Sequence, residues 1–242
     1  MNVYNVVIEV TRRCNLGCPH CLRGDVQPLT MSEEFVRDFL KPISYISTVT
    51  FSGGEPSLPS GIKGIERTLD WLDRWRVDVG SFYIATNGKR LGESFRALIR
   101  RLYFFCSDNE TSRVDISNDK WHSDTPRYLS DELESLNYEL QEDLVGFKMP
   151  SSPQWEPQVI REGRAVGWGS REYEGDELWW REYEYNGGGL ELHEGAVYLN
   201  CKGNVVTGCD FSYKSQDDPG NILCKASEFG ADVVRANCTN EN

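Results

Sequence analysis

No apolar stretch of this 242-residue sequence approaches the roughly 20 residues that a membrane-spanning helix needs. Arg12 and Arg13 interrupt the apolar N-terminal segment too early for a secretion signal. We therefore expect a soluble, cytoplasmic protein with no membrane partner. Internal repeats and low-complexity tracts are also absent, so we expect an ordinary globular chain that buries a sizeable core.

Positive charge is in deficit as well. The chain has 26 Lys and Arg residues against 38 Asp and Glu residues, which gives a net charge of −12 at pH 7. This balance disfavours a long footprint on DNA or RNA, because such a footprint needs cations along the phosphates. It does not exclude a local basic groove or a single nucleotide in a pocket. Nucleic acid is therefore a disfavoured partner.

Cysteine, by contrast, is abundant, with eight residues. In a cytoplasmic protein these are reduced thiols, so a group of them indicates a metal site and not disulfides. Three lie within residues 14–21, four lie in the last 42 residues, and Cys106 stands alone after two phenylalanines. We expect Cys106 to be a core residue.

Strand patterns alternate with helix patterns four times over the first 140 residues. The predicted strands are 3–10, 46–51, 82–85 and 113–117, and the predicted helices are 32–40, 61–75, 92–104 and 128–140. This alternation indicates parallel βα units. Each predicted strand ends in a polar or glycine-containing segment, at the sheet edge where parallel α/β folds bind their ligands.

The pattern changes beyond residue 150. Residues 158–160 are a candidate strand, and the aromatic, acidic segment 167–189 predicts a loop or short antiparallel strands. Residues 196–200 and 204–207 flank a glycine-containing turn and predict a β-hairpin. A short helix is expected over 226–236.

The cysteine triplet Cys14, Cys18 and Cys21 has the spacing C-x₃-C-x₂-C. Three thiolates on one loop can face one point, and their soft sulfur suits an iron–sulfur cluster or zinc. A closed zinc site needs four ligands, so His20 or a distant cysteine would have to complete it. The spacing alone leaves both interpretations open.

In its context after a first strand, the triplet resembles the signature of the radical S-adenosylmethionine (SAM) superfamily. In that family the three cysteines hold three irons of a [4Fe–4S] cluster, and the fourth iron binds the amino and carboxylate groups of SAM. The resemblance implies that Cys14, Cys18 and Cys21 are the cluster ligands. The family usually has an aromatic residue before the last cysteine, and His20 stands there in this chain.

Four further segments resemble family landmarks and follow in the family's order. They are Gly53-Gly54-Glu55-Pro56, Thr86-Asn87-Gly88, Ser117 with Asp119, and Gly163-Arg164-Ala165. The resemblance implies Gly53, Gly54 and Glu55 at the SAM amino group, Ser117 and Asp119 at the ribose, and Arg164 near the carboxylate. Each segment alone has an ordinary explanation as a turn or a helix cap.

The C-terminal part resembles the start of the SPASM or twitch extensions, which carry auxiliary iron–sulfur clusters. Four cysteines are available for a second cluster: Cys201, Cys209, Cys224 and Cys238. The chain has no C-x₂-C pair there, and five residues separate Gly203 from Cys209 where the family usually has four. Buried free thiols explain these residues equally well, so we do not assign them as ligands.

The expected fold is therefore α/β. A partial (βα)₆ TIM-like barrel would span residues 1–165, and a small β-rich extension would span 166–242. The aromatic segment 168–185 is a candidate cover for the barrel mouth. Arg23 follows the triplet and is expected at the surface, as most loop arginines are. We expect His122 to be a loop histidine with a local hydrogen bond, with a proton-transfer role as the alternative.

The resemblance implies an enzyme that cleaves SAM reductively to a 5′-deoxyadenosyl radical, which removes hydrogen from a substrate C–H bond. It also implies an electron donor such as flavodoxin or ferredoxin. The expected substrate is a peptide or an amino-acid-bearing small molecule. Alternatives are a nucleoside or nucleobase substrate, activation of a glycyl-radical partner and, for a non-enzyme, a cysteine-rich zinc-binding module.

Overall fold

The computed structural model describes most of the chain, namely residues 1–117, 122, 128–140, 143–148, 160–167, 173–184, 188–193 and 195–240. Asp119 and residues 158–159 of the candidate strand lie outside these ranges, as do residues 168–172 and 185 of the candidate cover. None of the helices in the described part is long and apolar enough to cross a membrane.

Parallel strands alternate with helices in the first half of the chain. The strands are β1 (Asn2–Thr11), β2 (Tyr45–Gly53), β3 (Asp78–Thr86), β4 (Arg113–Ile116) and β5 (Val145–Phe147), paired in that order. The helices are α1 (Glu33–Leu40), α2 (Pro59–Trp75), α3 (Glu93–Phe105) and α4 (Asp131–Leu140). The four predicted strands and four predicted helices are confirmed, and β5 is an additional strand.

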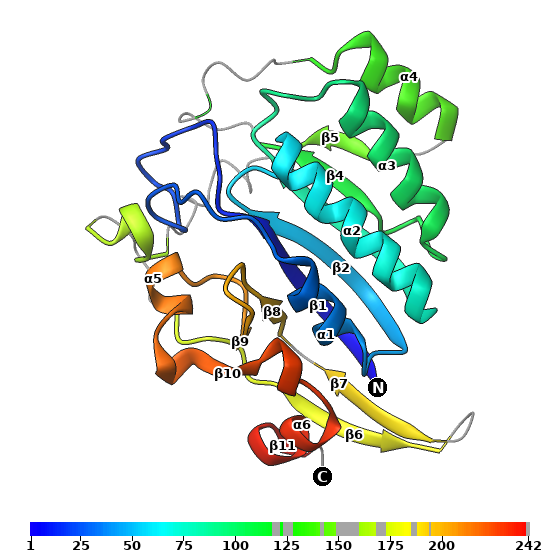
Figure 1. Ribbon diagram of the computed structural model, residues 1–242. Coiled ribbons are helices and arrows are strands. Elements are labelled where there is room, and N and C mark those ends of the chain that lie inside the picture. Colours follow the sequence, from blue (N-terminus) through cyan, green and yellow to red (C-terminus); the bar gives the residue numbers. More distant parts are fainter. Residues whose placement is uncertain are drawn as a thin grey trace, which may run out of the picture.

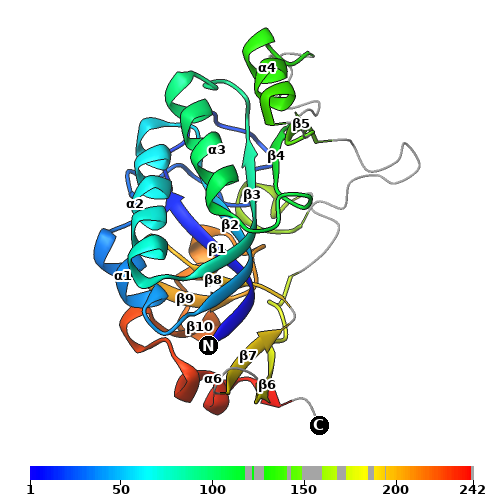
Figure 2. The ribbon, with the colours of Figure 1, turned by 90° about the vertical axis from the view of Figure 1, so that its right-hand side faces the viewer.

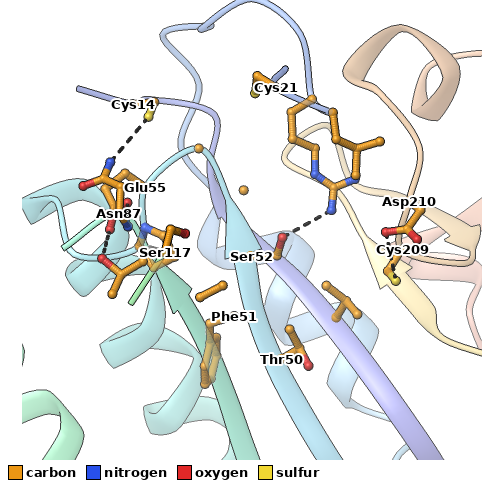
Figure 3. Close-up of a pocket in the computed structure, with 18 of the residues that line it drawn as sticks. Cys14, Cys21, Thr50, Phe51, Ser52, Glu55, Asn87, Ser117, Cys209 and Asp210 are labelled. Carbon is orange, nitrogen blue, oxygen red and sulfur yellow. Dashed lines mark hydrogen bonds between the residues drawn. The ribbon is translucent and has the colours of Figure 1, made fainter. Parts of the chain in front are cut away.

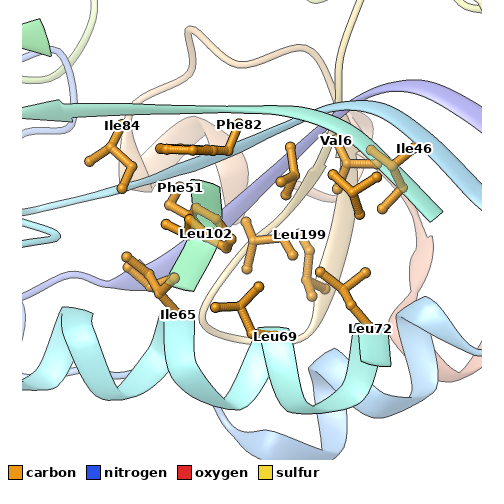
Figure 4. Close-up of a cluster of buried hydrophobic side chains, with 14 of the residues drawn as sticks. Val6, Ile46, Phe51, Ile65, Leu69, Leu72, Phe82, Ile84, Leu102 and Leu199 are labelled. Carbon is orange, nitrogen blue, oxygen red and sulfur yellow. The ribbon is translucent and has the colours of Figure 1, made fainter. Parts of the chain in front are cut away.

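The core lies between this sheet and its helices, and Figure 2 shows α1, α2 and α3 along one face. Strand residues Val6, Phe51 and Phe82 point toward Leu69 and Leu102 of the helices (Figure 4). All five are at most 1% exposed. Because side chains alternate along a strand, the intervening strand residues point to the opposite face of the sheet. Cys106 is buried in the same core, as expected.

The C-terminal part continues the same sheet beyond β1. Strands β7 (Gly189–His193) and β8 (Val197–Leu199) both pair parallel with β1. The predicted hairpin is confirmed as β8 with β9 (Asn204–Thr207), and β10 (Ile222–Lys225) adds an antiparallel edge strand. Mostly parallel pairing and mixed α/β content therefore describe the fold.

The segment predicted as a loop or short antiparallel strands contains β6 (Trp179–Tyr183), which pairs antiparallel with β7. A two-residue strand, β11 (Thr239–Asn240), pairs with β6. The helix expected over 226–236 is shorter: a 3₁₀ turn at Ala226–Glu228 precedes α6 (Ala231–Asn237). Gly230 separates the two with extended backbone, which ends the first turn.

The loops that leave β1, β2 and β3 emerge at one end of the sheet, away from the N-terminus (Figure 1). Parallel pairing causes this, because parallel strands all end at the same edge. The short helix α5 (Tyr213–Gln216) of the C-terminal part lies beside the loop that follows β1 (Figure 1).

Candidate functional site

A cavity of about 660 Å³ opens at this edge of the sheet. Its walls combine residues from the N-terminal and C-terminal parts of the chain. Among them are Cys14, Cys18, Cys21, Arg23, Ser52, Gly53, Gly54, Glu55, Asn87, Ser117, His122, Asp176, Cys209 and Asp210. Figure 3 shows Cys14, Glu55 and Asn87 on one side and Cys209 with Asp210 on the other. The volume falls in the usual range for a small-molecule site.

The loop after β1 brings all three triplet thiols to this cavity. Burial raises the pKa of Cys14, and the negative charges of Glu55, Cys21 and Cys18 raise it further, although a hydrogen bond from the backbone N–H of Leu16 opposes them. The mutual influence of the thiols reflects their proximity. Thiolates that share a cavity destabilise one another unless a cation binds between them.

Three thiols from one loop line this cavity, and thiolate sulfur is the usual ligand of an iron–sulfur cluster. A closed zinc site would need a fourth ligand beside them. In a cluster each cysteine binds a different iron, so three thiols along one cavity wall suit it.

His122 contacts the triplet from a distant part of the chain. Its Nε2 lies 3.6 Å from Cys18 Sγ, and its ring meets that of His20 edge-on at a centroid distance of 5.6 Å. The contact with Cys18 is therefore additional to the local hydrogen bond that the sequence led us to expect. Chain topology brings together residues 104 positions apart, which no local pattern signals.

The Gly53-Gly54 turn presses against the start of the cysteine loop. A Cβ at Gly53, whose φ is +130°, would overlap the carbonyl oxygen of Thr11, and a Cβ at Gly54 would overlap that of Arg13. In return, Gly54 N donates to Thr11 O at 2.7 Å and Glu55 N donates to Arg13 O at 2.9 Å. The glycines thus permit the close approach that positions this turn beside the thiols.

Glu55 connects the ends of β2 and β3 and is 1% exposed. Its Oε1 accepts from Ser57 N at 2.9 Å and from Thr86 Oγ1 at 2.6 Å. Its Oε2 accepts from Asn87 N at 2.8 Å. Each carboxylate oxygen has two lone pairs, so Oε2 has room for one further donor from the cavity.

The Thr86-Asn87-Gly88 segment contributes more to the site than its sequence resemblance suggested. Asn87 lines the cavity, donates to Asn15 Oδ1 at 2.9 Å, and lies 4.0 Å from Cys14 Sγ. The end of β3 is thereby tied to the cysteine loop. Ser117 also lines the cavity, and its backbone N–H donates to Thr86 O at 2.8 Å. Sequence reasoning named Ser117 and missed Asn87 as a site residue.

Arg164 lies on the other side of the cysteine loop and does not line this cavity. Its Nη1 donates to Cys18 O at 3.2 Å, its Nε to Asp25 at 2.9 Å, and its backbone N–H to Cys21 O at 3.0 Å. Gly163, at φ +57°, leaves no room for a Cβ beside Leu22 O. This turn holds the loop from behind and lines a neighbouring cavity of about 620 Å³.

Arg23 is half-buried, which corrects the expectation of a surface arginine. Its Nη1 donates to Phe211 O at 2.5 Å, and its Nη2 donates to Ser52 Oγ at 3.3 Å (Figure 3). The guanidinium stacks over Tyr198, 4.9 Å from the ring centroid. Phe211 and Tyr198 belong to the C-terminal part of the chain, so the sequence around Arg23 does not indicate that it is half-buried.

The C-terminal part supplies an acidic wall that sequence reasoning missed. Asp176 accepts from Tyr173 Oη at 2.6 Å and from Ala196 N at 2.8 Å. Burial raises the pKa of Cys209 to about 11, with a further contribution from the carboxylate of Asp210. Cys209 is therefore a protonated thiol at neutral pH.

The four C-terminal cysteines do not form one site. Cys209 lines the cavity, whereas Cys201 is buried against β1 and donates its S–H to Glu9 O at 3.0 Å. Cys224 and Cys238 pack with the hydrophobic core. Among the residues described, these thiols make no group that could hold a metal ion, so a second cluster has no support from their arrangement.

No family model and no curated protein matches the sequence. Solved structures do resemble the fold. "Native anSMEcpe with bound AdoMet" has a TM-score of 0.56 and 12% identity, over 98% of this chain and 82% of that one. The same protein with AdoMet and the Cp18Cys peptide gives 0.49 and 11%, over 98% and 81%. SuiB from Streptococcus suis with the precursor peptide SuiA gives 0.31 and 11%, over 60% and 38%.

Almost the whole chain aligns with the first of these structures. At 12% identity the similarity is one of fold.

Proposed function

We propose that this protein is a radical SAM enzyme, which binds a [4Fe–4S] cluster on Cys14, Cys18 and Cys21 and cleaves SAM reductively. One observation carries the proposal: three thiols from one loop line the same cavity as the Gly53-Gly54-Glu55 turn. A fold neighbour whose structure contains AdoMet supports it. The arrangement of β1–β5 supports a partial (βα)₆ barrel over residues 1–165, with 166–242 as a SPASM/twitch-like extension.

When bound, the reduced cluster supplies the electron that breaks a C–S bond of SAM and releases a 5′-deoxyadenosyl radical. The chain's own residues bind and orient. Glu55 offers Oε2 to the ammonium group of SAM, and Ser117 with Asp119 would bind the ribose. For Arg164, the hydrogen bonds to Cys18 and Asp25 support a positioning role on the cysteine loop in place of direct contact with the carboxylate.

We further propose that the substrate is a peptide or an amino-acid-bearing small molecule. The cavity supports this with both signs of charge, since Arg23, Asp176 and Asp210 all line it. The charges of a zwitterionic or peptide-like group complement those of this cavity better than a neutral nucleobase does. The electron would come from a carrier such as flavodoxin or ferredoxin.

The test is reductive SAM cleavage. The protein is reconstituted anaerobically with iron and sulfide, then given dithionite and SAM, and 5′-deoxyadenosine is quantified. Cleavage should disappear in the triple variant Cys14→Ala/Cys18→Ala/Cys21→Ala and persist in Cys238→Ala, which removes a thiol outside the cavity. A colourless protein that carries zinc and leaves SAM intact would overturn the proposal.

A further inference from the structure

Three arginines beside the cysteine loop are buried or half-buried, and their partners differ in charge. Arg12 pairs with Glu9 at 2.6 Å and with Asp217 at 3.4 Å. Arg164 pairs with Asp25 at 2.9 Å. Arg23 forms no ion pair with any carboxylate in the described part of the chain; its partners are the carbonyl of Phe211, the hydroxyl of Ser52 and the ring of Tyr198.

A half-buried guanidinium whose direct partners are all neutral is unusual, because a charge removed from water is normally compensated by an opposite charge. Although burial opposes it, the charge of Glu9, which accepts from the Tyr198 hydroxyl, raises the pKa of Arg23 without forming an ion pair with it. Arg23 is also the one Lys or Arg among the described residues that line the 660 Å³ cavity. A guanidinium has five N–H donors, and the two hydrogen bonds to Phe211 and Ser52 leave three. The compensating anion can therefore come from a ligand in the cavity.

We infer that Arg23, together with Ser52, forms a carboxylate-binding subsite inside the cavity. The fixed geometry supports this: stacking on Tyr198 and the bond to Phe211 O hold the planar group in place before a ligand arrives. A preorganised fork of N–H donors matches a carboxylate in two parallel hydrogen bonds. Sulfate-like or phosphate anions fit less well, because Asp176 and Asp210 share the cavity and repel a higher negative charge.

The carboxylate has two sources, and the inference rests on the proposed function for both. One is the methionine moiety of SAM, since Ser52 directly precedes the Gly53-Gly54 turn. The other is an amino-acid moiety of the substrate, since Phe211 and the acidic wall belong to the C-terminal part. In either case an α-amino acid group is bound with its carboxylate at Arg23.

The experiment measures dissociation constants by anaerobic calorimetry on the reconstituted protein. The first pair of probes is SAM and decarboxylated SAM. The second pair, added to the SAM-loaded protein, is N-acetylglycine and N-acetylglycinamide. If SAM is the source, the wild type should prefer SAM over its decarboxylated form about 10- to 100-fold, as expected for a hydrogen-bonded charge pair. If the substrate is the source, that preference should appear for the acid over the amide.

Arg23→Met should lower whichever preference the wild type shows by about 10- to 100-fold, leaving for SAM what the cluster contributes. Arg23→Lys should retain part of the effect, because an ammonium keeps the charge but loses the fork. Arg13→Met is the matched control, since Arg13 is exposed on the same loop and its side chain donates to the backbone carbonyl of Pro28. It should leave both preferences unchanged. Thermal unfolding and iron content report whether each variant folds and binds the cluster. If Arg23→Met does not fold, Arg23→Lys and the wild-type probe pairs still decide the question.

Two failures are distinguishable. A wild-type protein that binds neither cluster nor SAM refutes the proposed function, and the acid–amide comparison on that protein still tests Arg23. A wild-type protein that binds SAM but shows no carboxylate preference in either pair overturns the subsite. A preference that is as large in Arg23→Met as in the wild type overturns it as well.

Discussion

Glu55 offers the sharpest test of how the site is built. Its buried carboxylate receives hydrogen bonds from Ser57 N, Thr86 Oγ1 and Asn87 N. In Glu55→Gln, the amide oxygen can replace Oε1 and keep the first two bonds. The amide NH₂ then takes the place of Oε2 and faces the N–H of Asn87, so one bond to a charged acceptor is lost and two donors oppose each other.

A hydrogen bond to a charged group contributes about 1.5–3 kcal/mol, so Glu55→Gln should lower the free energy of unfolding by about 3 kcal/mol. Glu55→Ala loses all three bonds and should lower it by about 4–5 kcal/mol. For a chain of this size each kcal/mol corresponds to about 2–4 °C in Tm, so the glutamine variant should melt roughly 6–12 °C lower.

The assay is urea unfolding of the metal-free chain without SAM, which separates stability from ligand binding. Glu66→Gln is the control, because Glu66 is exposed on α2 and should change the unfolding free energy by less than about 0.5 kcal/mol. Thr86→Val should cost less in the Glu55→Ala background than in the wild type, since the two share a bond. Equal stability of Glu55→Gln and Glu66→Gln would refute the reasoning.

Three further predictions follow from the same geometry. Gly53→Ala should abolish SAM binding in calorimetry and lower Tm, because its Cβ overlaps backbone; Gly92→Ala, with nothing within 4 Å of the added Cβ, should leave both unchanged. Arg12→Met should destabilise the chain by about 3–5 kcal/mol in urea by stranding a buried carboxylate, whereas Arg101→Met, from an exposed pair, should cost under about 1 kcal/mol. Burial raises the pKa of Cys209 to about 11, so little thiolate forms below pH 9. The rate at which iodoacetamide alkylates Cys209, measured by peptide mass spectrometry, should therefore increase with pH up to about 11. Fast modification at pH 7 would contradict this.

The strand-end residues could be predicted from the sequence because their arrangement depends on one rule. Parallel strands end at one edge, so segments after β1, β2 and β3 had to meet there. Cys14, Gly53 and Asn87 meet for that reason, and no side-chain detail was needed. By contrast, β5 has only three residues, too few to show an alternating pattern.

The contribution of the C-terminal part could not be predicted in the same way. Pairing of Val7 with Tyr198 is a contact between segments about 190 residues apart, and local periodicity carries no information about it. Because Tyr198 and Phe211 come from that part, the burial of Arg23 depends on the same pairing. The sequence therefore contains the residues of the acidic wall and of the guanidinium subsite but gives no indication that they lie together.

The hydrogen bonds of the glycine turn also decide which charge it can bind. The N–H groups of Gly54 and Glu55 are already donated to Thr11 O and Arg13 O, so they offer nothing to an anion. An ammonium group only donates, and it needs acceptors such as the second lone pair of Glu55 Oε2. The turn therefore suits the cationic end of an amino acid, and Ser52 with Arg23 offers donors in the same cavity for its anionic end. The bonds that hold the turn in place thus also orient an amino-acid group across the cavity.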